Sequence, residues 1–157
     1  MLRVKPFIFV GVILLLAVFG WGEWRARTAV KAAASGYRGA SEVNSVLVLS
    51  VSRDLAAGKK PADILNSFRA ASERQEKSLA GFYKAVPFWW RLQPGRSEMR
   101  LIKLAEAESR ALTALTDSLA LLEQSAENEW SEPLKKLNQA TAEFGSAHRA
   151  IMQTFIP

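Results

Sequence analysis

Cysteine is absent from this chain of 157 residues, and histidine occurs once. The first absence excludes a thiol nucleophile, a disulfide and a cysteine-based metal site. The second excludes the HExxH motif, the facial triad and the paired Glu-x-x-His set of di-iron proteins, because each of these needs more than one histidine. We therefore expect no metal, no other cofactor and no enzymatic activity.

Glycine and proline are also scarce, with 9 and 6 residues, and the glycines are too scattered to form a phosphate-binding loop. The long stretches free of both are rich in alanine, leucine, serine, glutamate, lysine and arginine, which is the composition of helices. Beyond residues 1–24 about 130 residues remain, enough for one domain with a single core. The expected fold is all-α.

The chain is basic, with a net charge of +6 and a pI near 9.9. A basic excess can indicate nucleic-acid binding, but no helix here carries a run of lysine and arginine interleaved with aromatic residues. A basic protein beside a membrane is favoured by the anionic headgroups of the lipids. We therefore expect contact with membrane lipids and no nucleic acid.

The most informative part of the chain is an apolar run over residues 6–22, which contains no charged side chain. A membrane-spanning helix needs about 20 apolar residues and roughly 17 at the least, so the run reaches the lower limit. Trp21 and Trp24 lie at its end, in the position of an interfacial aromatic belt. We expect residues 1–24 to form a signal anchor, that is, a single N-terminal transmembrane helix.

A cleaved signal peptide is the alternative for the same segment. Gly20 and Gly22 offer small residues at the −3 and −1 positions of a cleavage site, and cleavage after Gly22 would leave a secreted soluble helical protein. The count of lysine and arginine on the two sides of the run slightly favours a cytoplasmic bundle. A short charged tail is, however, an ordinary start for an anchor that exports the rest of its chain. We expect a single-pass protein of the inner or plasma membrane, with its bundle on the extracytoplasmic (periplasmic) side.

The rest of the chain is expected to form a connector over residues 25–40 and a helical-bundle domain over residues 41–157. Gly36 and Gly39 should kink or break the connector. The segment 41–57 has apolar residues at helical spacing but also resembles a strand, and we favour a helix because helices surround it. Its core face is expected at Val43, Leu47, Val51 and Leu55.

Three further helices follow, which gives an up-down bundle of three to four helices. The first has Pro61 in its first turn and is stopped by Pro87, because the residue before a proline avoids helical geometry. The next two begin at Ser97 and Ser131, which are of the residue type that favours N-caps. Core-facing positions spaced alternately by three and four, as in a coiled coil, are Leu65, Phe68, Ser72, Gln75, Leu79, Phe82 and Val86, then Leu101, Ala105, Glu108, Leu112, Leu115, Leu119 and Leu122, and finally Trp130, Leu134, Leu137, Thr141, Phe144, His148, Ile151 and Phe155.

The last two of these helices predict a hairpin of defined register. A turn at Asn128, in a polar stretch where a turn belongs, brings Leu112 opposite Phe144 and Ala105 opposite Ile151. The pairing of a small with a large side chain is what interdigitating layers need.

The same register places Glu108 opposite His148, in one polar layer inside the apolar hairpin. Single polar core residues fix the register of coiled coils, and we favour this interpretation. A pH switch is an alternative, because imidazole titrates near neutral pH. A metal site is a weaker alternative, because zinc needs three or four ligands and only two are found here.

Aromatic and basic residues gather in the segment 88–91. If the preceding helix returns to the membrane, this segment lands at the surface, where amphipathic rings and cations suit the headgroup region. The aromatics could instead close the bottom of the core or form a hot spot for a protein partner. The candidate contacts with membrane or partner are Trp21, Trp24, Phe88, Trp89, Trp90 and Arg91.

No motif in the chain identifies a family or a reaction. We expect a non-enzymatic single-pass membrane protein whose bundle acts as an accessory, scaffold or regulatory subunit and binds a protein partner at the cell envelope. The partner could be contacted by the exposed faces of the bundle, by the segment 88–91 or by the transmembrane helix, where Gly11 and Gly20 permit close approach of another helix. A homo-oligomer is also allowed. The alternative function is a membrane-anchored bundle that senses a small molecule or pH.

Overall fold

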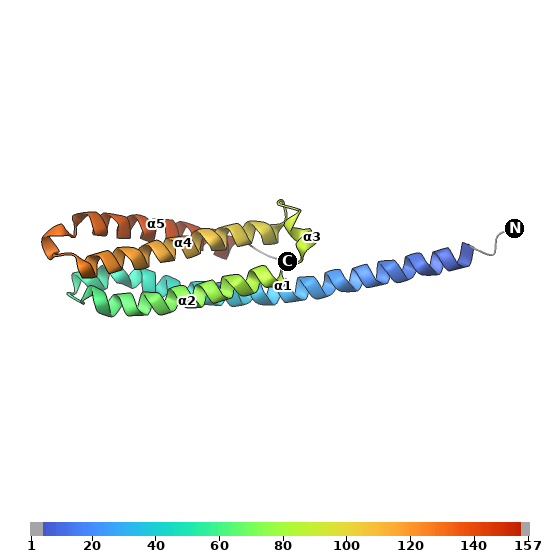
Figure 1. Cartoon of the computed structure of the whole chain (residues 1–157), viewed down its shortest axis with the longest axis horizontal. Helices are drawn as coiled ribbons and strands as arrows, with labels where there is room; N and C mark the ends of the chain where they lie inside the picture. The colour runs from blue at the N-terminus through green and yellow to red at the C-terminus, as the bar shows by residue number, and fades with distance from the viewer. Residues whose placement is uncertain (1–4, 155–157) are drawn as a thin grey trace.

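In the computed structural model, residues 5–154 are described, with side chains described from Val10 onwards. This part of the chain contains four long helices, α1 (Lys5–Ala56), α2 (Pro61–Ala85), α4 (Ser97–Gln124) and α5 (Ser131–Gln153). Two short elements connect them, the one-turn helix α3 (Phe88–Arg91) and the 3₁₀ helix η1 (Glu127–Glu129). No strand occurs in the described residues, so the all-α prediction is confirmed (Figure 1).

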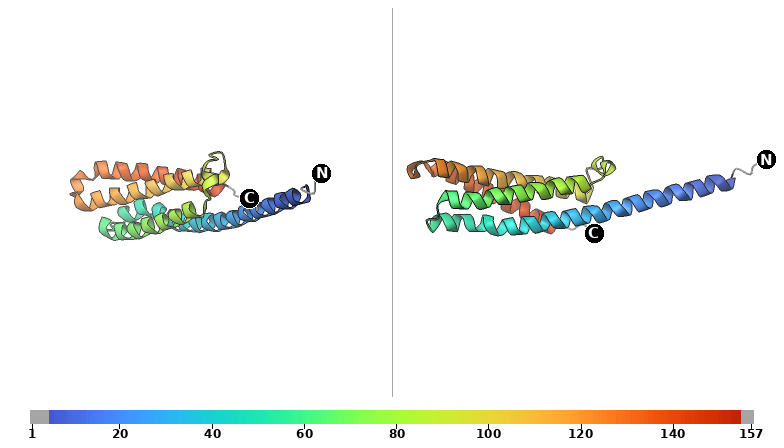
Figure 2. Two further views of the ribbon diagram at one scale, coloured as in Figure 1. Left: turned by 45° about the vertical axis from the view of Figure 1, so that its right-hand side comes forward. Right: turned by 60° about the horizontal axis from the view of Figure 1, so that its bottom comes forward.

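The four long helices run alternately up and down and form a bundle (Figures 1 and 2). α1 packs on α2, α2 on α4, and α4 on α5, so neighbours in the chain are neighbours in space. The α1–α5 side of the bundle is closed by fewer contacts than the other three sides. The α1–α2 turn and η1 lie at one end of the bundle, and α3 lies at the other end.

α1 is one continuous helix of 52 residues, about 78 Å long at 1.5 Å per residue. Its N-terminal part projects beyond the bundle (Figures 1 and 2). The expected break at Gly36 and Gly39 is wrong, and the segment 25–40 is helical throughout. Both glycines lie on the exposed side of α1, while the opposite side is buried from Val30 to Val51. We infer that packing of the buried side offsets the cost of the two glycines in a helix, about 1 kcal/mol each.

No helix in the described part of the chain is long and apolar enough to cross a membrane. Among the residues whose side chains are described, the uncharged run extends from Val10 to Gly22. That is about 20 Å of helix at 1.5 Å per residue, against a hydrocarbon core of about 30 Å. The expected transmembrane helix is therefore not found among these residues, and its beginning falls in residues 1–9, outside the described side chains.

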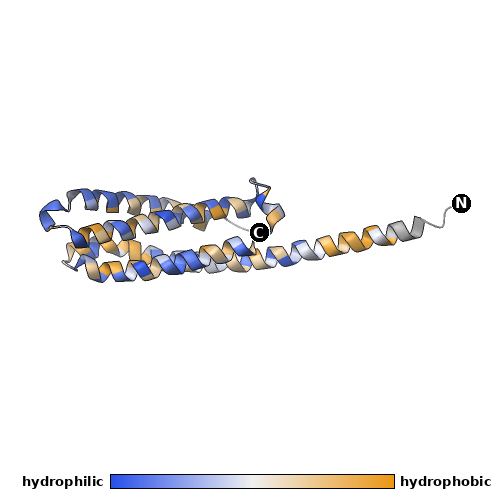
Figure 3. Cartoon of the chain, viewed as in Figure 1, coloured by the Kyte–Doolittle hydropathy of each residue, from blue (hydrophilic) through white to orange (hydrophobic). Residues whose placement is uncertain are grey.

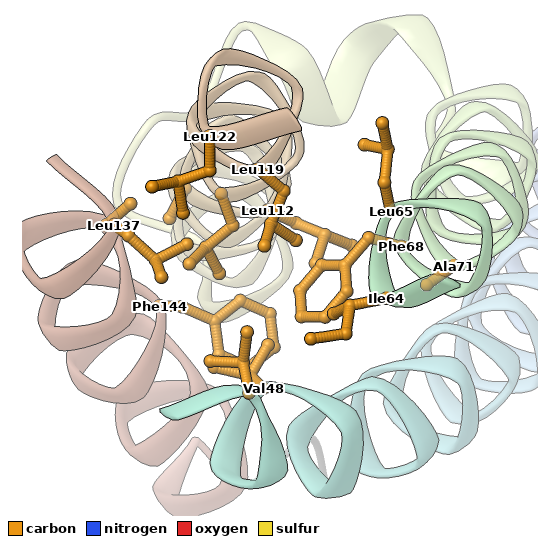
Figure 4. Close-up of a cluster of buried hydrophobic side chains, with 14 residues drawn as sticks. Val48, Ile64, Leu65, Phe68, Ala71, Leu112, Leu119, Leu122, Leu137 and Phe144 are labelled. Atoms are coloured by element: carbon orange, nitrogen blue, oxygen red, sulfur yellow. The ribbon is translucent and has the colours of Figure 1, made fainter. Parts of the chain in front are cut away.

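The core of the bundle consists of two apolar clusters. The first extends towards η1 and includes residues of all four long helices (Figure 4): Val48, Val51, Ile64, Leu65, Phe68, Ala71, Ala111, Leu112, Leu115, Leu119, Leu122, Leu137, Ala140 and Phe144. The second lies towards α3 and contains Val30, Ala34, Tyr37, Phe82, Val86, Trp90, Leu101, Ile102, Ala105 and Ile151. Burial of each large side chain contributes about 1.5–3 kcal/mol, so both clusters stabilise the bundle.

The predicted register of α4 and α5 is confirmed by the contact between Glu108 and His148, whose Oε1 and Nδ1 atoms are 3.1 Å apart. All the α4 positions expected to face the core are buried. Each predicted pair also shares one cluster, Leu112 with Phe144 and Ala105 with Ile151. Phe155, the last predicted core position of α5, lies outside the described residues.

The predicted core face of α1 is partly wrong. Val43 is 57% exposed, whereas its neighbour Asn44 is buried. The buried positions follow one alternation of four and three across the two glycines: Val30, Ala34, Tyr37, Ser41, Asn44, Val48 and Val51. Polar residues occupy the middle of this series, so an apolar pattern alone does not reveal it.

The prolines predicted the ends of the helices more accurately than the serines did. α2 begins at Pro61 and ends before Pro87, as predicted. Ser97 and Ser131 are the first residues of α4 and α5 rather than their N-caps, and no side-chain hydrogen bond caps either helix. Each helix therefore starts one residue earlier than a serine cap would allow.

Candidate functional site

Six polar side chains form a layer between the two apolar clusters. They come from all four long helices, with Tyr37, Ser41 and Asn44 on α1, Gln75 on α2, Glu108 on α4 and His148 on α5. On each helix they lie between residues of the first and of the second cluster. All are buried except His148, whose side chain is 19% exposed. These six residues are referred to below as the polar layer.

The Glu108 carboxylate is the centre of the polar layer. Tyr37 Oη and Gln75 Nε2 donate to its Oε2 atom over 2.7 and 2.9 Å. Ser41 Oγ donates to Oε1 over 2.5 Å, and His148 Nδ1 lies 3.1 Å from the same oxygen. A carboxylate carries only acceptors, so donors on three other helices match it. Among the described side chains, no buried nitrogen or oxygen lacks a hydrogen-bond partner.

The contacts of His148 indicate which ring nitrogen carries a hydrogen. Nδ1 is 2.8 Å from Ser41 Oγ, and that hydroxyl already donates its only hydrogen to Glu108. An unprotonated Nδ1 would face only lone pairs, so we assign the hydrogen to Nδ1, which then donates. The imidazole also stacks on Phe144, with the ring centroids 5.9 Å apart. Together these contacts hold the ring in one orientation.

Tyr37 and Gln75 carry the network across the bundle. Gln75 Nε2 also donates to Tyr37 Oη over 2.8 Å, and Gln75 Oε1 accepts from Asn44 Nδ2 over 2.6 Å. The Tyr37 hydroxyl lies 2.9 Å from the carbonyl oxygen of Ala105 as well. Burial raises the pKa of Tyr37, and the negative charge of Glu108 raises it further. The phenol therefore stays protonated and acts as a donor.

The polar layer is arranged to fix the positions of the helices. Its buried donors and acceptors are used within the bundle, and sliding one helix by a residue would separate the donors from the carboxylate. Buried polar residues set register in coiled coils by the same mechanism. Among the described residues there is no group of three or more His, Cys, Asp or Glu side chains that could hold a metal ion.

Sequence reasoning found two members of the polar layer and missed the others. Glu108 and His148 follow from the hairpin register. Gln75 could have been identified from the sequence, because it is a polar residue at a predicted core position of α2. Tyr37 was missed because the expected break at Gly36 and Gly39 concealed the continuous spacing of α1. Ser41 and Asn44 were missed because their burial depends on partners supplied by other helices.

A second cluster of candidate residues lies at the end of the bundle from which α1 projects (Figure 1). Trp90 was one of the candidate contacts with membrane or partner, but it is fully buried in the second apolar cluster. It therefore belongs to the core. Phe88, Trp89 and Leu92 are 70%, 52% and 67% exposed. α3 is a single helical turn, and its consecutive side chains therefore point in different directions.

Glu23 ties α1 to this end of the bundle. Its Oε2 accepts from Trp90 Nε1 over 3.0 Å and from Trp89 Nε1 over 3.5 Å. Its Oε1 is 3.3 Å from Arg96 and 3.4 Å from Arg27, and the Arg96 guanidinium lies 3.7 Å from the centroid of the Trp90 ring. Partial burial raises the pKa of Glu23, but the hydrogen bonds from these four groups outweigh it and hold the pKa below its usual value of 4.5.

The other predicted contact residues lie at the same end. Trp21 and Trp24 are exposed on α1, and Arg25 lies over the Trp21 ring at 5.1 Å. Trp21 is two residues from Glu23, so it points to the opposite side of α1 from α3. Arg91 donates to the carbonyl oxygen of Tyr83 over 2.7 Å near the end of α2. The exposed apolar residues at this end, on α1 and on α3 with the turn after it, are referred to as the aromatic belt: Trp21, Trp24, Phe88, Trp89 and Leu92.

A third feature is the outward face of α1 inside the bundle. Val43, Val46 and Leu49 are all exposed there. Val46 lies on the side of the helix opposite to Asn44 and Val48, which face the core. Large apolar side chains are thus uncovered along a regular helix.

Comparisons with protein family models, with curated proteins and with solved structures found no match for this chain. The polar layer, the aromatic belt and the outward face of α1 are therefore interpreted from their geometry.

Proposed function

We propose that this chain is a membrane-tethered helical bundle that acts as an accessory, scaffold or regulatory protein, by binding another protein and not by catalysis. The observation that carries the proposal is the apolar N-terminal part of α1, which projects from the bundle (Figure 3). Between Val10 and Phe19 its large apolar side chains are 48% to 73% exposed. They lie on every side of the helix, and a helix that is apolar all round needs an apolar environment.

In the proposed arrangement the run 6–22 lies in the bilayer. Its side chains are described from Val10 onwards, and the sequence extends the uncharged run back to Pro6. Glu23 and Arg25 are the first charged residues after the run, and they would lie at the membrane surface. From the sequence we expect the bundle on the extracytoplasmic side of the inner or plasma membrane.

The outward face of α1 supports the protein-binding part of the proposal. Val43, Val46 and Leu49 present an apolar stripe on a helix that the polar layer and the core hold in place. A partner helix can pack on such a stripe through anchors spaced by three or four residues. A rigid helix that leaves the membrane and enters a bundle also fixes the height of this stripe above the bilayer.

The membrane tether is tested by alkaline extraction of cell membranes that contain the chain or its Leu14→Lys, Leu15→Lys variant. Lysine at the centre of a spanning helix costs about 2.5–3.5 kcal/mol, so we expect the parent chain to stay in the membrane and the variant to be extracted. The Val46→Lys, Leu49→Lys variant is the matched control, because it adds two lysines to exposed apolar positions of the same helix outside the run. Extraction of the parent chain would contradict the tether.

Partner binding is tested by a photo-crosslinking residue at Val46 in cells, with Arg74 on the exposed side of α2 as the control position. We expect Val46 to form an adduct with one other protein of defined mass and Arg74 to form none. If neither position gives an adduct, or both give the same set of adducts, the outward face of α1 is not a specific binding surface.

A pH-sensing bundle is the second candidate, and the partial exposure of His148 within the polar layer favours it. Solvent can reach a ring that also contacts the buried Glu108. The test is amide hydrogen exchange of α5 from about pH 5 to about pH 8, corrected for intrinsic exchange rates. Sensing requires a pH-dependent change in the parent chain that disappears in His148→Gln. Equal protection across this range would exclude it.

A further inference from the structure

We propose that the aromatic belt and the basic residues around it form a docking site for an anionic lipid surface. In this arrangement Phe88, Trp89 and Leu92 enter the headgroup region, and neighbouring cations contact lipid phosphates. The inference rests on the proposed membrane tether, and it adds that the base of the bundle binds the bilayer directly.

The first step in the argument is the position of α3. It lies at the end of the bundle from which the apolar part of α1 projects (Figures 1 and 2). Glu23 holds it there, through contacts of 3.0 Å with Trp90 and 3.3 Å with Arg96. Because Glu23 directly follows the uncharged run, any bilayer that accommodates the run has its surface near Glu23. α3 then meets that surface without a change in fold.

The second step is the exposure of apolar side chains on both sides of the emerging helix. Phe88, Trp89 and Leu92 extend from α3 and the turn after it, and each is more than half exposed. Trp21 and Trp24 are exposed on α1 at the same end. Tryptophan is enriched at the membrane–water interface, where its ring is partly in apolar surroundings and its N–H group remains hydrated.

The third step is the charge around the belt. Between residues 77 and 105 the only acidic residue is Glu98, which pairs with Arg96 at 3.4 Å. The exposed basic residues of the same stretch are more numerous: Lys77, Lys84, Arg91, Arg100 and Lys103. Basic side chains beside a membrane are attracted by the negative surface potential of anionic lipids. The combination of cations and amphipathic rings therefore matches an anionic bilayer.

A lipid surface fits these residues better than a protein partner does. The belt lies on two sides of the emerging helix, with Trp21 on one side of α1 and α3 on the other. A bilayer contacts both sides of the helix at one height, whereas a protein partner would cover one side of it. A protein that binds to one side of this end is the competing outcome of the test.

The absence of native cysteine permits a test with single environment-sensitive labels. The full chain is reconstituted into vesicles of phosphatidylcholine and phosphatidylglycerol with a fluorophore at Phe88→Cys, and lipids that carry a quencher at the interface are added. Phe19→Cys labels the tether, and Asn128→Cys labels the opposite end of the bundle. Leu92→Cys replaces Phe88→Cys if the first label disturbs folding, which is checked by circular dichroism.

We expect the label at position 88 to be quenched several-fold more strongly than the label at position 128. Quenching at position 19 without quenching at position 88 would overturn the docking and leave the tether intact. No quenching at position 19 would overturn the tether and the docking with it. Protection of position 88 only when a second protein is present would identify a protein-binding site instead.

The role of charge is tested with the same label in Lys84→Gln, Arg100→Gln, Lys103→Gln protein. We expect this variant to lose most of the excess quenching at position 88, and added salt to have the same effect on the parent chain. Lys59→Gln, Lys60→Gln is the matched control, because these lysines are exposed at the opposite end. Equal quenching in vesicles with and without phosphatidylglycerol would overturn the requirement for anionic lipid.

Discussion

The Glu108 carboxylate accepts hydrogen bonds from three other helices within a single layer of the core. Its removal leaves several buried donors without a partner, and each costs about 1–3 kcal/mol. We expect Glu108→Ala to lower the free energy of unfolding by at least about 3 kcal/mol, measured by denaturant titration with circular dichroism in mild detergent. Glu106→Ala, two residues away and outside the polar layer, should change it by less than about 0.5 kcal/mol. Equal effects of the two variants would show that the layer is not a stabilising unit.

The ionisation of Glu23 makes the stability of the fold depend on pH in the acidic range. Since its pKa in the folded chain is held below 4.5, the tie to α3 stabilises the fold above that pH and is lost as the pH falls through the lowered pKa. We therefore expect faster amide exchange around Trp90, relative to intrinsic rates, below about pH 4. In Glu23→Gln the same region should be equally protected above and below this pH. A parent chain with no acid-dependent change in this region would contradict the tie.

Single residues also show what sequence reasoning can detect. The pair Glu108 and His148 was predictable, because two polar residues interrupt apolar heptads at the same height. Ser41 and Asn44 were not, because nothing in an isolated helix distinguishes a buried polar residue from an exposed one. Their burial depends on acceptors and donors supplied by helices far away in the chain.

At the scale of elements, the continuity of α1 is the main departure from the sequence prediction. Gly36 and Gly39 were expected to break the helix, yet an added Cβ at either position meets no atom within 4 Å. We expect Gly36→Ala and Gly39→Ala to stabilise the fold by about 0.5–1 kcal/mol each, since alanine replaces glycine inside a regular helix. Thermal unfolding followed by circular dichroism measures this effect.

The matched control for these variants is Gly58, which has a positive φ of 79° in the turn after α1. Gly58→Ala has the same open space around the new Cβ but a strained backbone, and it should destabilise the fold by about 1–2 kcal/mol. If Gly36→Ala and Gly39→Ala also destabilised the fold, α1 would be interrupted at those glycines in solution.

The hairpin of α4 and α5 was predictable as a whole, because its apolar positions keep one spacing over both helices and its turn is polar. Leu112 is fully buried against the first cluster, so Leu112→Ala should cost about 2–5 kcal/mol. Leu121→Ala, at a position of the same helix that is 41% exposed, should cost much less. Urea unfolding of the two variants measures the difference, and similar values would contradict the register.

For the whole molecule, up-down packing follows from short turns between long amphipathic helices, and it was predictable. The placement of α3 at the end from which α1 projects was predictable too, but the contacts that hold it there were not, because they join Glu23 to residues more than sixty positions away. The same contacts concentrate cations and exposed aromatic rings at one end of the molecule. The opposite end contains the acidic residues Glu123, Glu127, Glu129 and Glu132. In our proposal this difference in charge between the two ends places the basic end on the bilayer and the acidic end away from it.

The central claim is that one uninterrupted helix extends from the bilayer into the core of the bundle. It is tested most directly by amide hydrogen exchange of the full chain in lipid nanodiscs, which reports protection residue by residue. We predict strong protection of residues 10–22 by the bilayer and of residues 30–51 by the core, with a helical but more exchangeable segment between them. Rapid exchange of residues 10–22, as in an uncovered helix that projects into water, would contradict the account.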